Sequence, residues 1–395
     1  MKLDTPSLDD IDVSGRRVLM RVDFNVPTDD SGAITDDTRI RAALPTVREI
    51  LAGGGKPVLM CHFGRPKGEV VPDLKVGRIG ERLGELLGTP VLKLDASIGE
   101  AVQEAVASAP AGTTVLLENV RFHGGETRGD EALAAEYAKL GDVFVGDAFG
   151  ASHRDHASVS GVARLLPSVA GRLLEREIQA FGRVLEDPQR PLVAVLGGAK
   201  VSDKLTVVDN LLDRVDSLLV GGGMAYTFLK AQGVNIGSSL VQDDQLDLCR
   251  TALAKAAEKG VDLCLPTDHV VADRFAADAT TEVTQVEIPE GRMALDIGPA
   301  TREAFAAKLA EARTVVWNGP MGVFEMEAFR AGTEAVARAL ESTSGYTVVG
   351  GGDSVAALHL LDLTESVSHI STGGGASLEL LEGKTLPGIA ALALK

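Results

Sequence analysis

The stretch Leu192-Val-Ala-Val-Leu-Gly-Gly-Ala-Lys200 joins five apolar residues directly to a glycine pair. An uninterrupted apolar run of this length is typical of a strand buried on both faces of a parallel sheet. Runs of the same kind, each followed by a glycine or polar cluster and then by a helical stretch, recur at Val18–Val22, Val58–Met60, Val115–Leu117, Val143–Val145, Leu218–Val220, Thr314–Trp317 and Thr347–Val349. This alternation predicts an α/β fold with three-layer, Rossmann-like parallel sheets flanked by helices.

The chain should form two domains of similar size. Its 395 residues exceed the usual length of one domain. Leu174, Ile178, Phe181 and Leu185 follow helical spacing, and the pattern stops before the prolines of segment 188–191. We therefore expect an N-terminal domain at residues 1–187, which includes a hinge helix at 172–186, and a C-terminal domain at residues 188–380.

Composition restricts the classes of partner. With 56 acidic and 39 basic residues, the net charge of −17 disfavours nucleic acid. The three cysteines, an odd number without a C-x-x-C pair, indicate buried thiols rather than disulfides or zinc. The acidic N-terminus lacks a signal-peptide core, and no apolar run approaches a membrane span. These features predict a cytosolic protein without membrane contact.

The strands of the first half are followed by basic and polar residues. Ligands bind beyond the carboxyl ends of parallel strands, so these residues are candidates for a common site. Three strand ends deliver an arginine, and with Arg39 they form a candidate anion site at Arg39, His62, Arg65, Arg121 and Arg154. A single arginine would more simply be a solvated surface residue, but the recurrence favours a site. His153 and His156 are better explained as orienting or packing residues.

The strands of the second half are followed by glycines. These lie at 197–198, 221–223, 319 and 350–352, and a further triplet occupies 373–375. Glycine allows close backbone approach, and amides at a helix N-terminus attract phosphate, so this half should bind a nucleotide. A Walker A motif, a G-x-G-x-x-G fingerprint and the protein-kinase catalytic loop are all missing, which disfavours P-loop NTPases, dehydrogenases and protein kinases.

Together these strings resemble the phosphoglycerate kinase family over nearly the whole chain. The resemblance is carried, in the family's order, by Arg21-Val-Asp-Phe-Asn-Val-Pro27, His62-Phe-Gly-Arg65, Gly197-Gly-Ala-Lys-Val-Ser-Asp-Lys204, Trp317-Asn-Gly-Pro-Met-Gly-Val-Phe-Glu325 and Gly350-Gly-Gly-Asp-Ser354. It implies reversible phosphoryl transfer from 1,3-bisphosphoglycerate to Mg-ADP, giving 3-phosphoglycerate and ATP, by a monomer. It also implies that the tail, residues 381–395, packs on the N-terminal domain.

The resemblance assigns roles to individual residues. The implied phosphoglycerate ligands are Asp23, Asn25, Arg39, His62, Arg65, Arg121 and Arg154. The implied nucleotide ligands are Lys204, Gly221, Gly222, Asn318, Glu325, Gly351, Gly352, Asp353 and Ser354, with Asp353 also holding Mg²⁺. Ala294 stands where many members have glycine, and Ser354 where they have threonine.

The chemistry predicts which groups are catalytic. The nucleophile of the reverse reaction is a carboxylate with a pKa of about 3.5, already ionised at neutral pH, so no general base is needed. Charge neutralisation is assigned to Arg39, Lys200, the magnesium at Asp353 and the helix N-terminus at Gly373, Gly374 and Gly375. Lys200 and Lys204, four residues apart, are expected on one helix face. Because the substrates are expected on different domains, the domains should close about the hinge helix.

Two alternative functions belong to other classes of protein. A phosphometabolite or nucleotide sensor on the same fold would bind without turnover, although Lys200, Arg39 and Asp353 are all present. A nicotinamide-dependent oxidoreductase is opposed by the missing fingerprint.

Overall fold

The computed structural model describes residues 5–394, which form two compact units. One unit runs up to Gln179 and resumes at Thr385, and the other spans Ala180–Lys384. The division falls inside one helix, α5 (Arg172–Leu185), rather than at the proline-rich segment that follows it. Among the described residues no helix is long and apolar enough to cross a membrane.

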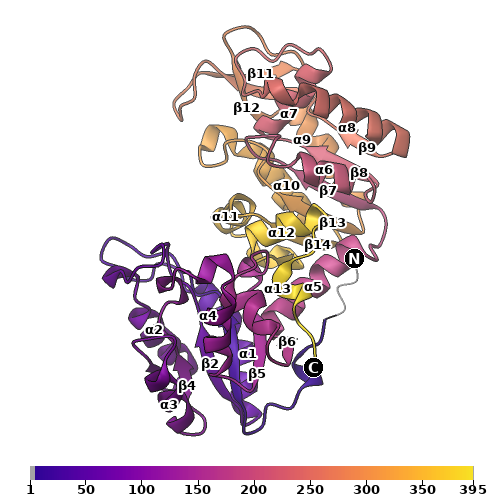
Figure 1. The fold of residues 1–395 in the computed structure, drawn as a ribbon. Helices are drawn as coiled ribbons and strands as arrows, with labels where there is room; N and C mark the ends of the chain where they lie inside the picture. Colours follow the sequence, from indigo (N-terminus) through magenta and orange to yellow (C-terminus); the bar gives the residue numbers. More distant parts are fainter. Residues whose placement is uncertain (1–4, 395) are drawn as a thin grey trace. The chain divides into compact units, whose positions relative to one another are not determined.

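The N-terminal unit is built on a six-stranded parallel sheet with the order β3-β4-β2-β1-β5-β6. Strands β2, β4, β5 and β6 of this sheet are labelled in Figure 1. Its strands are β1 (Arg17–Val22), β2 (Lys56–Met60), β3 (Val91–Lys93), β4 (Thr114–Leu116), β5 (Val143–Asp147) and β6 (Ser168–Ala170). The helices are α1 (Thr38–Ala52), α2 (Gly77–Leu87), α3 (Glu100–Ser108), α4 (Glu131–Ala138), the first part of α5 and, near the C-terminus, α13 (Pro387–Ala390). The four apolar runs predicted in this half are confirmed as strands.

The C-terminal unit contains a second six-stranded parallel sheet, β15-β14-β13-β7-β8-β9. Its strands are β7 (Leu192–Leu196), β8 (Ser217–Val220), β9 (Asp262–Cys264), β13 (Thr314–Asn318), β14 (Tyr346–Gly350) and β15 (His369–Ile370). The helices are α6 (Leu205–Leu211), α7 (Gly223–Ala231), α8 (Leu246–Lys259), α9 (Pro299–Glu311), α10 (Ala331–Ser342), α11 (Gly352–Leu360) and α12 (Gly374–Leu381). The four predicted strands of this half are confirmed too.

A three-stranded antiparallel sheet, absent from the prediction, completes this unit. Its order is β11-β10-β12, with β10 at Asp268–Ala272, β11 at Thr281–Gln285 and β12 at Met293–Ile297. Val271 and Ala294 belong to the same buried cluster as Tyr226 of α7, whereas Val270 and Leu295 cluster with Phe329. The small sheet therefore extends the unit's apolar core beside α7.

Each large sheet has a point at which the strand order reverses. From β1 the chain proceeds to β2 on one side and later returns to β5 on the other. From β7 it proceeds to β8 and later returns to β13 on the opposite side. Ligands of open parallel sheets bind beyond the strand ends at such switch points, so each unit offers one site.

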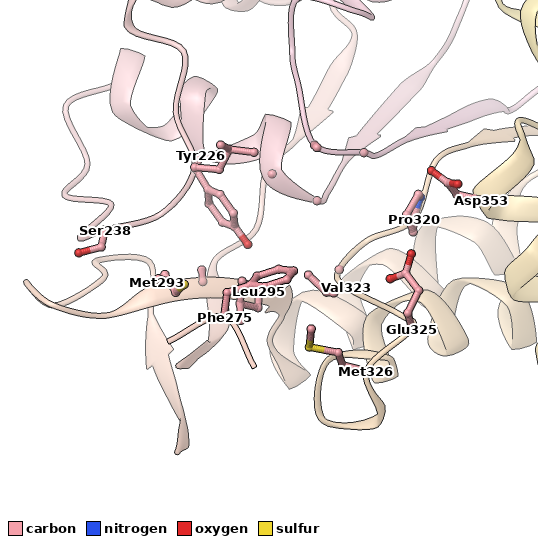
Figure 2. Close-up of a pocket in the computed structure, with 17 residues that line it drawn as sticks. Tyr226, Ser238, Phe275, Met293, Leu295, Pro320, Val323, Glu325, Met326 and Asp353 are labelled. Carbon is pink, nitrogen blue, oxygen red and sulfur yellow. The ribbon is translucent and has the colours of Figure 1, made fainter. Parts of the chain in front are cut away.

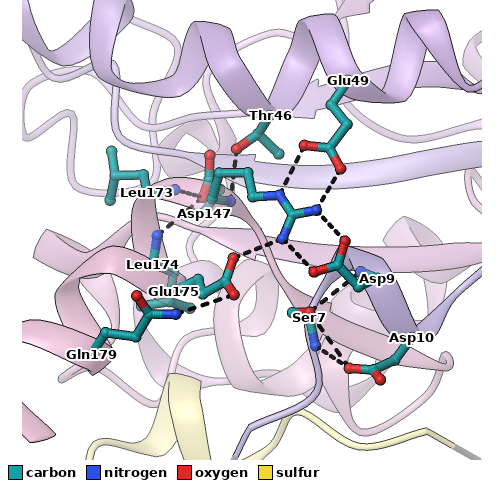
Figure 3. A network of polar contacts seen from close by, with 11 residues as sticks. Ser7, Asp9, Asp10, Thr46, Glu49, Asp147, Leu173, Leu174, Glu175 and Gln179 are labelled. Atoms are coloured by element: carbon teal, nitrogen blue, oxygen red, sulfur yellow. Dashed lines mark hydrogen bonds and ion pairs between the residues drawn. The ribbon is translucent and has the colours of Figure 1, made fainter.

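The start of α5 is fixed by a charged network in the N-terminal unit (Figure 3). Arg172 pairs with Asp9, Glu49 and Glu175 at 2.6, 2.6 and 2.8 Å. Beside it, Oδ1 of Asp147, the last residue of β5, accepts hydrogen bonds from the first-turn amides of Leu173 and Leu174 at 2.9 and 3.2 Å. These bonds satisfy amides that have no partner inside the helix.

The C-terminal tail forms part of the N-terminal unit. The Gly388 amide donates to the Ser152 carbonyl at 2.8 Å, and the Ser168 amide donates to the Ala393 carbonyl at 2.9 Å. A Cβ at Gly388 would lie 2.9 Å from the Ser152 Cα, so only glycine fits this approach. The chain thus crosses from one unit to the other and back.

Candidate active site

In the N-terminal unit, the glycine of His62-Phe-Gly-Arg65 ties two predicted ligands together. The Gly64 amide donates to Asn25 Oδ1 at 2.8 Å, and the Gly64 carbonyl accepts from Arg121 Nη1 at 2.7 Å. Gly64 has a φ of 62°, in the left-handed region that favours glycine. This turn therefore positions Asn25 and Arg121 beyond the ends of β1 and β4.

Arg39 reaches the same strand ends from the first turn of α1. Its Nη1 lies 2.6 Å from Asp23 Oδ2. The Asp23 side chain is 12% exposed, whereas that of Arg39 is 41% exposed. Arg39 thus has a fixed carboxylate partner and still presents part of its guanidinium to solvent.

Arginines without a carboxylate partner surround a cavity of about 580 Å³. It is lined by Arg65, Arg121 and Arg154, with Lys67, His123, Arg128 and His156 beside them. Among the described residues, no ion pair to a carboxylate involves Arg65, Arg121 or Arg154. Burial, and then the charges of Arg154 and Arg21, lower the pKa of Arg121 to about 10. With no carboxylate paired directly to these three arginines, the cluster is a positive site that suits an anion with several charges.

His62 lies in the same positive field. Its side chain is buried, and burial together with the charges of Arg21, Arg121, Arg154 and Arg39 holds its pKa well below the usual range. His62 is therefore neutral at physiological pH. With His62, the structure brings together in this unit all seven residues predicted as phosphoglycerate ligands.

In the C-terminal unit the glycine turns pack directly against one another. The Gly197 amide donates to the Asn318 carbonyl, the Gly198 amide to the Pro320 carbonyl and the Gly222 amide to the Met321 carbonyl, at 3.1, 3.1 and 2.9 Å. A Cβ on Gly197 would lie 2.0 Å from the Pro320 oxygen, and one on Gly222 would lie 2.7 Å from the Gly198 nitrogen. Side chains are excluded here, and bare backbone lines the end of the sheet.

Two helix N-termini meet at this end of the sheet. Gly351, with a φ of 90°, precedes α11, and Gly373 precedes α12. A Cβ on Gly374 would lie 3.7 Å from both the Gly351 Cα and the Gly352 nitrogen. The N-terminal, positive dipole ends of two helices therefore lie side by side, an arrangement that favours phosphate.

The prediction for the two lysines is wrong in part. Residues 200–204 form a loop and turns, and α6 begins only at Leu205, so Lys200 and Lys204 share no helix face. Lys200 is exposed, whereas Lys204 is buried and its Nζ donates to the backbone and side-chain oxygens of Asn318 at 2.7 and 2.6 Å. Burial lowers the pKa of Lys204 to about 8, against the opposing charges of Asp353 and Asp203.

Ser354 and Asn318 are buried, and the side-chain oxygen of each accepts a hydrogen bond within the protein. Ser354 Oγ accepts from the Gly319 amide at 2.6 Å. Asn318 lies between Lys204 and Gly351, whose Cβ would come within 3.1 Å of its Nδ2. Both side chains therefore shape the glycine turns, in addition to any ligand contact.

A cleft of about 670 Å³ opens beside these turns (Figure 2). Glu325 and Asp353 lie at one end in Figure 2, Gly198 and Gly222 also line the cleft, and its apolar lining is formed by Tyr226, Leu240, Phe275, Met293, Ala294, Leu295, Val323 and Met326. The predicted set contained only the polar end. The apolar lining comes from α7, β12 and separate loops, and Phe275 is 60% exposed, so no periodic pattern indicates it.

The donor set fits a metal carried by a ligand rather than a resident metal. No group of three or more His, Cys, Asp or Glu side chains able to hold an ion occurs in the described part of the chain. Asp353 is a single exposed carboxylate in the first turn of α11, at the end of the cleft next to the glycine amides. Mg²⁺ is commonly bound by one or two carboxylates together with substrate phosphates.

Comparisons with known proteins identify the family of the chain. The family model described as phosphoglycerate kinase matches residues 8–384. The phosphoglycerate kinase of Moorella thermoacetica is 55% identical over 98% of this chain and 99% of its own length, and that of Synechococcus elongatus is 54% identical over 98% and 97%. The solved structure of the phosphoglycerate kinase of Coxiella burnetii superposes with a TM-score of 0.92 at 42% identity, covering 98% of this chain and 99% of the other. The chain belongs to the phosphoglycerate kinase family.

Proposed function

We propose that the arginine cluster of the N-terminal unit holds phosphoglycerate and that the glycine turns and cleft of the C-terminal unit hold the nucleotide. The chain is a phosphotransferase with a carboxyl group as acceptor. In this proposal it transfers a phosphoryl group reversibly from 1,3-bisphosphoglycerate to Mg-ADP, giving 3-phosphoglycerate and ATP. In the same proposal it acts as a monomer, which sedimentation would test.

The contrast between the two strand-end surfaces carries the proposal. Guanidinium groups recognise carboxylate and phosphate oxygens through paired N–H donors, which suits a small metabolite bearing both groups. Bare amides and helix N-termini suit a chain of phosphates, and an apolar cleft suits a base. Glu325 lies at the polar end of the cleft, where its carboxylate would accept from ribose hydroxyls.

The catalytic task is to neutralise charge and align the reactants. The acceptor carboxylate is ionised at neutral pH, so no base has to remove a proton. Both buried histidines nearest the arginines are unsuited to acid–base work, since burial and neighbouring arginines lower the pKa of His62 and bring that of His156 to about 4. Arg39, Lys200 and the amides at Gly373, Gly374 and Gly375 would stabilise the metaphosphate-like transition state.

Asp353 would hold Mg²⁺ together with the nucleotide phosphates. When bound, the ion would neutralise charge on those phosphates. The protein's own contribution is the carboxylate at the start of α11 and the amides of Gly351 and Gly352 beside it. Lys204, held by Asn318, adds a buried donor next to these turns.

A coupled assay with 3-phosphoglycerate, ATP and magnesium tests the reaction. The proposal expects turnover that depends on all three components. Binding of both ligands without turnover would contradict it and favour a sensor on the same fold. A thermal-shift series tests the alternative of a nicotinamide-dependent oxidoreductase, since Mg-ADP should stabilise the protein and NAD should not.

A further inference from the structure

Arg21 is a fully enclosed charge in the middle of the N-terminal sheet. It lies in β1, opposite Met60 of β2 and Gly146 of β5, and is only 2% exposed. A guanidinium removed from water must have its donors satisfied, because a buried unpaired charge is strongly destabilising. The hydrogen bonds of Arg21 therefore indicate its role.

Arg21 links a buried carboxylate to His62. Its Nε donates to Ser158 Oγ at 2.8 Å, and its Nη2 lies 3.1 Å from His62 Nδ1. The Ser158 hydroxyl and amide in turn donate to the two carboxylate oxygens of Glu126, at 2.5 and 3.0 Å. Glu126 is completely buried. The contacts form one continuous relay in the order Glu126, Ser158, Arg21 and His62.

The chemistry of the donors fixes the direction of every bond in this relay. A guanidinium only donates, so Ser158 Oγ accepts from Arg21 and must direct its own proton to Glu126. For the same reason His62 Nδ1 must accept from Arg21 Nη2. A neutral imidazole that accepts at Nδ1 carries its proton on Nε2.

The surroundings of His62 exclude the other protonation states. A doubly protonated ring would place a donor against the Arg21 donor and add a charge beside Arg39, Arg121 and Arg154. In the part of the chain that the structure describes, no residue accepts a hydrogen bond from His62 Nε2. Nε2 is also not one of the fully buried side-chain atoms that lack a hydrogen-bond partner. Its proton is thus available to a ligand in the arginine cluster.

We infer that Glu126, Ser158 and Arg21 are positioning residues that hold His62 as its Nε2–H tautomer, so that this neutral side chain donates a hydrogen bond to an anionic oxygen of phosphoglycerate. The inference rests on the proposed function for its ligand, but not for the tautomer itself. The opposite tautomer would turn a lone pair toward the anion and repel it. Without the relay, His62 would be free to adopt either form.

Nitrogen-15 NMR of the histidine rings in the ligand-free, full-length enzyme tests the tautomer directly. His62→Ala identifies the signal. We expect a non-protonated Nδ1 and a protonated Nε2 from pH 6 to 8. A proton on Nδ1, or an equal mixture of tautomers, would overturn the inference.

Variants of the relay test its cause. Ser158→Ala and Arg21→Met should convert the His62 signal to a tautomer mixture and raise the KM for 3-phosphoglycerate about tenfold or more, with a smaller effect on kcat. Arg21→Lys, which keeps a donor, should restore part of the pure signal. Ser160→Ala is the matched control, because this buried serine lies two residues away and its hydroxyl bonds to Asp155 and to the His156 carbonyl instead. A pure Nε2–H signal in both Ser158→Ala and Arg21→Met would overturn the inference.

Ligand titration separates this inference from the proposed function. Saturating 3-phosphoglycerate should shift the His62 Nε2 proton. If calorimetry shows binding and this proton does not move, its donor role is wrong. If calorimetry shows no binding, the proposed function fails while the tautomer result stands.

Discussion

The two units use the same scaffold and equip it in opposite ways. Each has a parallel sheet of six strands with one switch point at the central strands. Beyond that point the N-terminal unit places long charged side chains, whereas the C-terminal unit places backbone from which side chains are excluded by contacts as short as 2.0 Å for a hypothetical Cβ. The sheet thus sets where a ligand binds, and the residues after each strand set which ligand it is.

The two kinds of site should fail in different ways. A site made of guanidiniums loses function when a charge is removed, and its fold survives if the lost side chain was partly exposed. A site made of amides loses function when a methyl group is added. Substitutions of these two kinds therefore test whether the two sites are built differently.

The largest effect is expected for the residues that stabilise the transition state of phosphoryl transfer. Arg39→Ala and Lys200→Ala should each lower kcat about 10³-fold, because each removes a cation from the transition state. Arg41→Ala is the matched control for α1, since Arg41 is more exposed and pairs with Asp37 instead. Steady-state kinetics in both directions checks this, and near-normal kcat in either variant would remove that residue from the catalytic set.

A smaller effect, confined to one ligand, is expected for the arginine cluster. Arg121→Gln removes a charged donor from the cavity and should weaken 3-phosphoglycerate binding about 10- to 100-fold, the range for hydrogen bonds to charged groups. Mg-ADP affinity should not change. Calorimetric titration of each ligand measures both, with Arg164→Gln, an exposed arginine paired with Asp155, as the control. Equal losses for both ligands would contradict the division of roles.

A methyl group in the glycine turns should have the reverse selectivity. At Gly374 a Cβ meets only ordinary contacts, and φ there is not positive, so Gly374→Ala should fold normally. The methyl group would lie between two helix N-termini and should weaken Mg-ADP binding about tenfold, which is the effect expected from the loss of one hydrogen bond. Gly77→Ala, at the first residue of α2 with no atom within 4 Å, is the control. Unchanged nucleotide affinity in Gly374→Ala would place the phosphates elsewhere.

Stability should depend on pH in the same way in both units. Burial raises the pKa of Asp147 in one unit and of Asp296 in the other from 3.8 to about 7. The folded protein then retains protons that the unfolded chain has released, so the free energy of unfolding falls as pH rises from about 4 to 7. Each carboxyl contributes at most about 1.4 kcal/mol per pH unit.

Asparagine at either position tests this dependence. Asp147→Asn and Asp296→Asn keep an acceptor for the neighbouring amides and remove the titration, so each should make the slope shallower. Urea unfolding at pH 5 and pH 7 measures it. A slope equal to that of the unmodified chain in both variants would show that these carboxyls are ionised in the fold.

The sequence was most informative where one physical signal dominated. Eight buried strands were predicted because continuous apolar runs are hard to place elsewhere, and the residues after them led to both candidate sites. Strand β11 of the antiparallel sheet was missed because it is almost entirely exposed and has no apolar run. Phe275 gave no signal, since its place in the cleft depends on the path of a loop.

Other differences arise from side-chain environment. Spacing alone placed Lys200 and Lys204 on one helix, but the glycine turn continues to the N-cap of α6 and buries only Lys204. Arg21 is a charged residue within an otherwise apolar strand, and in the sequence this was a sign that it has a buried polar partner. Its partners, Ser158 and Glu126, lie more than a hundred residues away along the chain, and only the fold brings them together.

Hydrogen exchange with each ligand alone tests the division of roles most directly, because it reports on the amides of both units at once. The account predicts that 3-phosphoglycerate slows exchange after β1, β2, β4 and β5, and that Mg-ADP slows exchange at 197–204, 221–226, 318–325, 351–356 and 373–377. Protection of the glycine turns by 3-phosphoglycerate alone, or of the arginine-bearing strand ends by Mg-ADP alone, would contradict it.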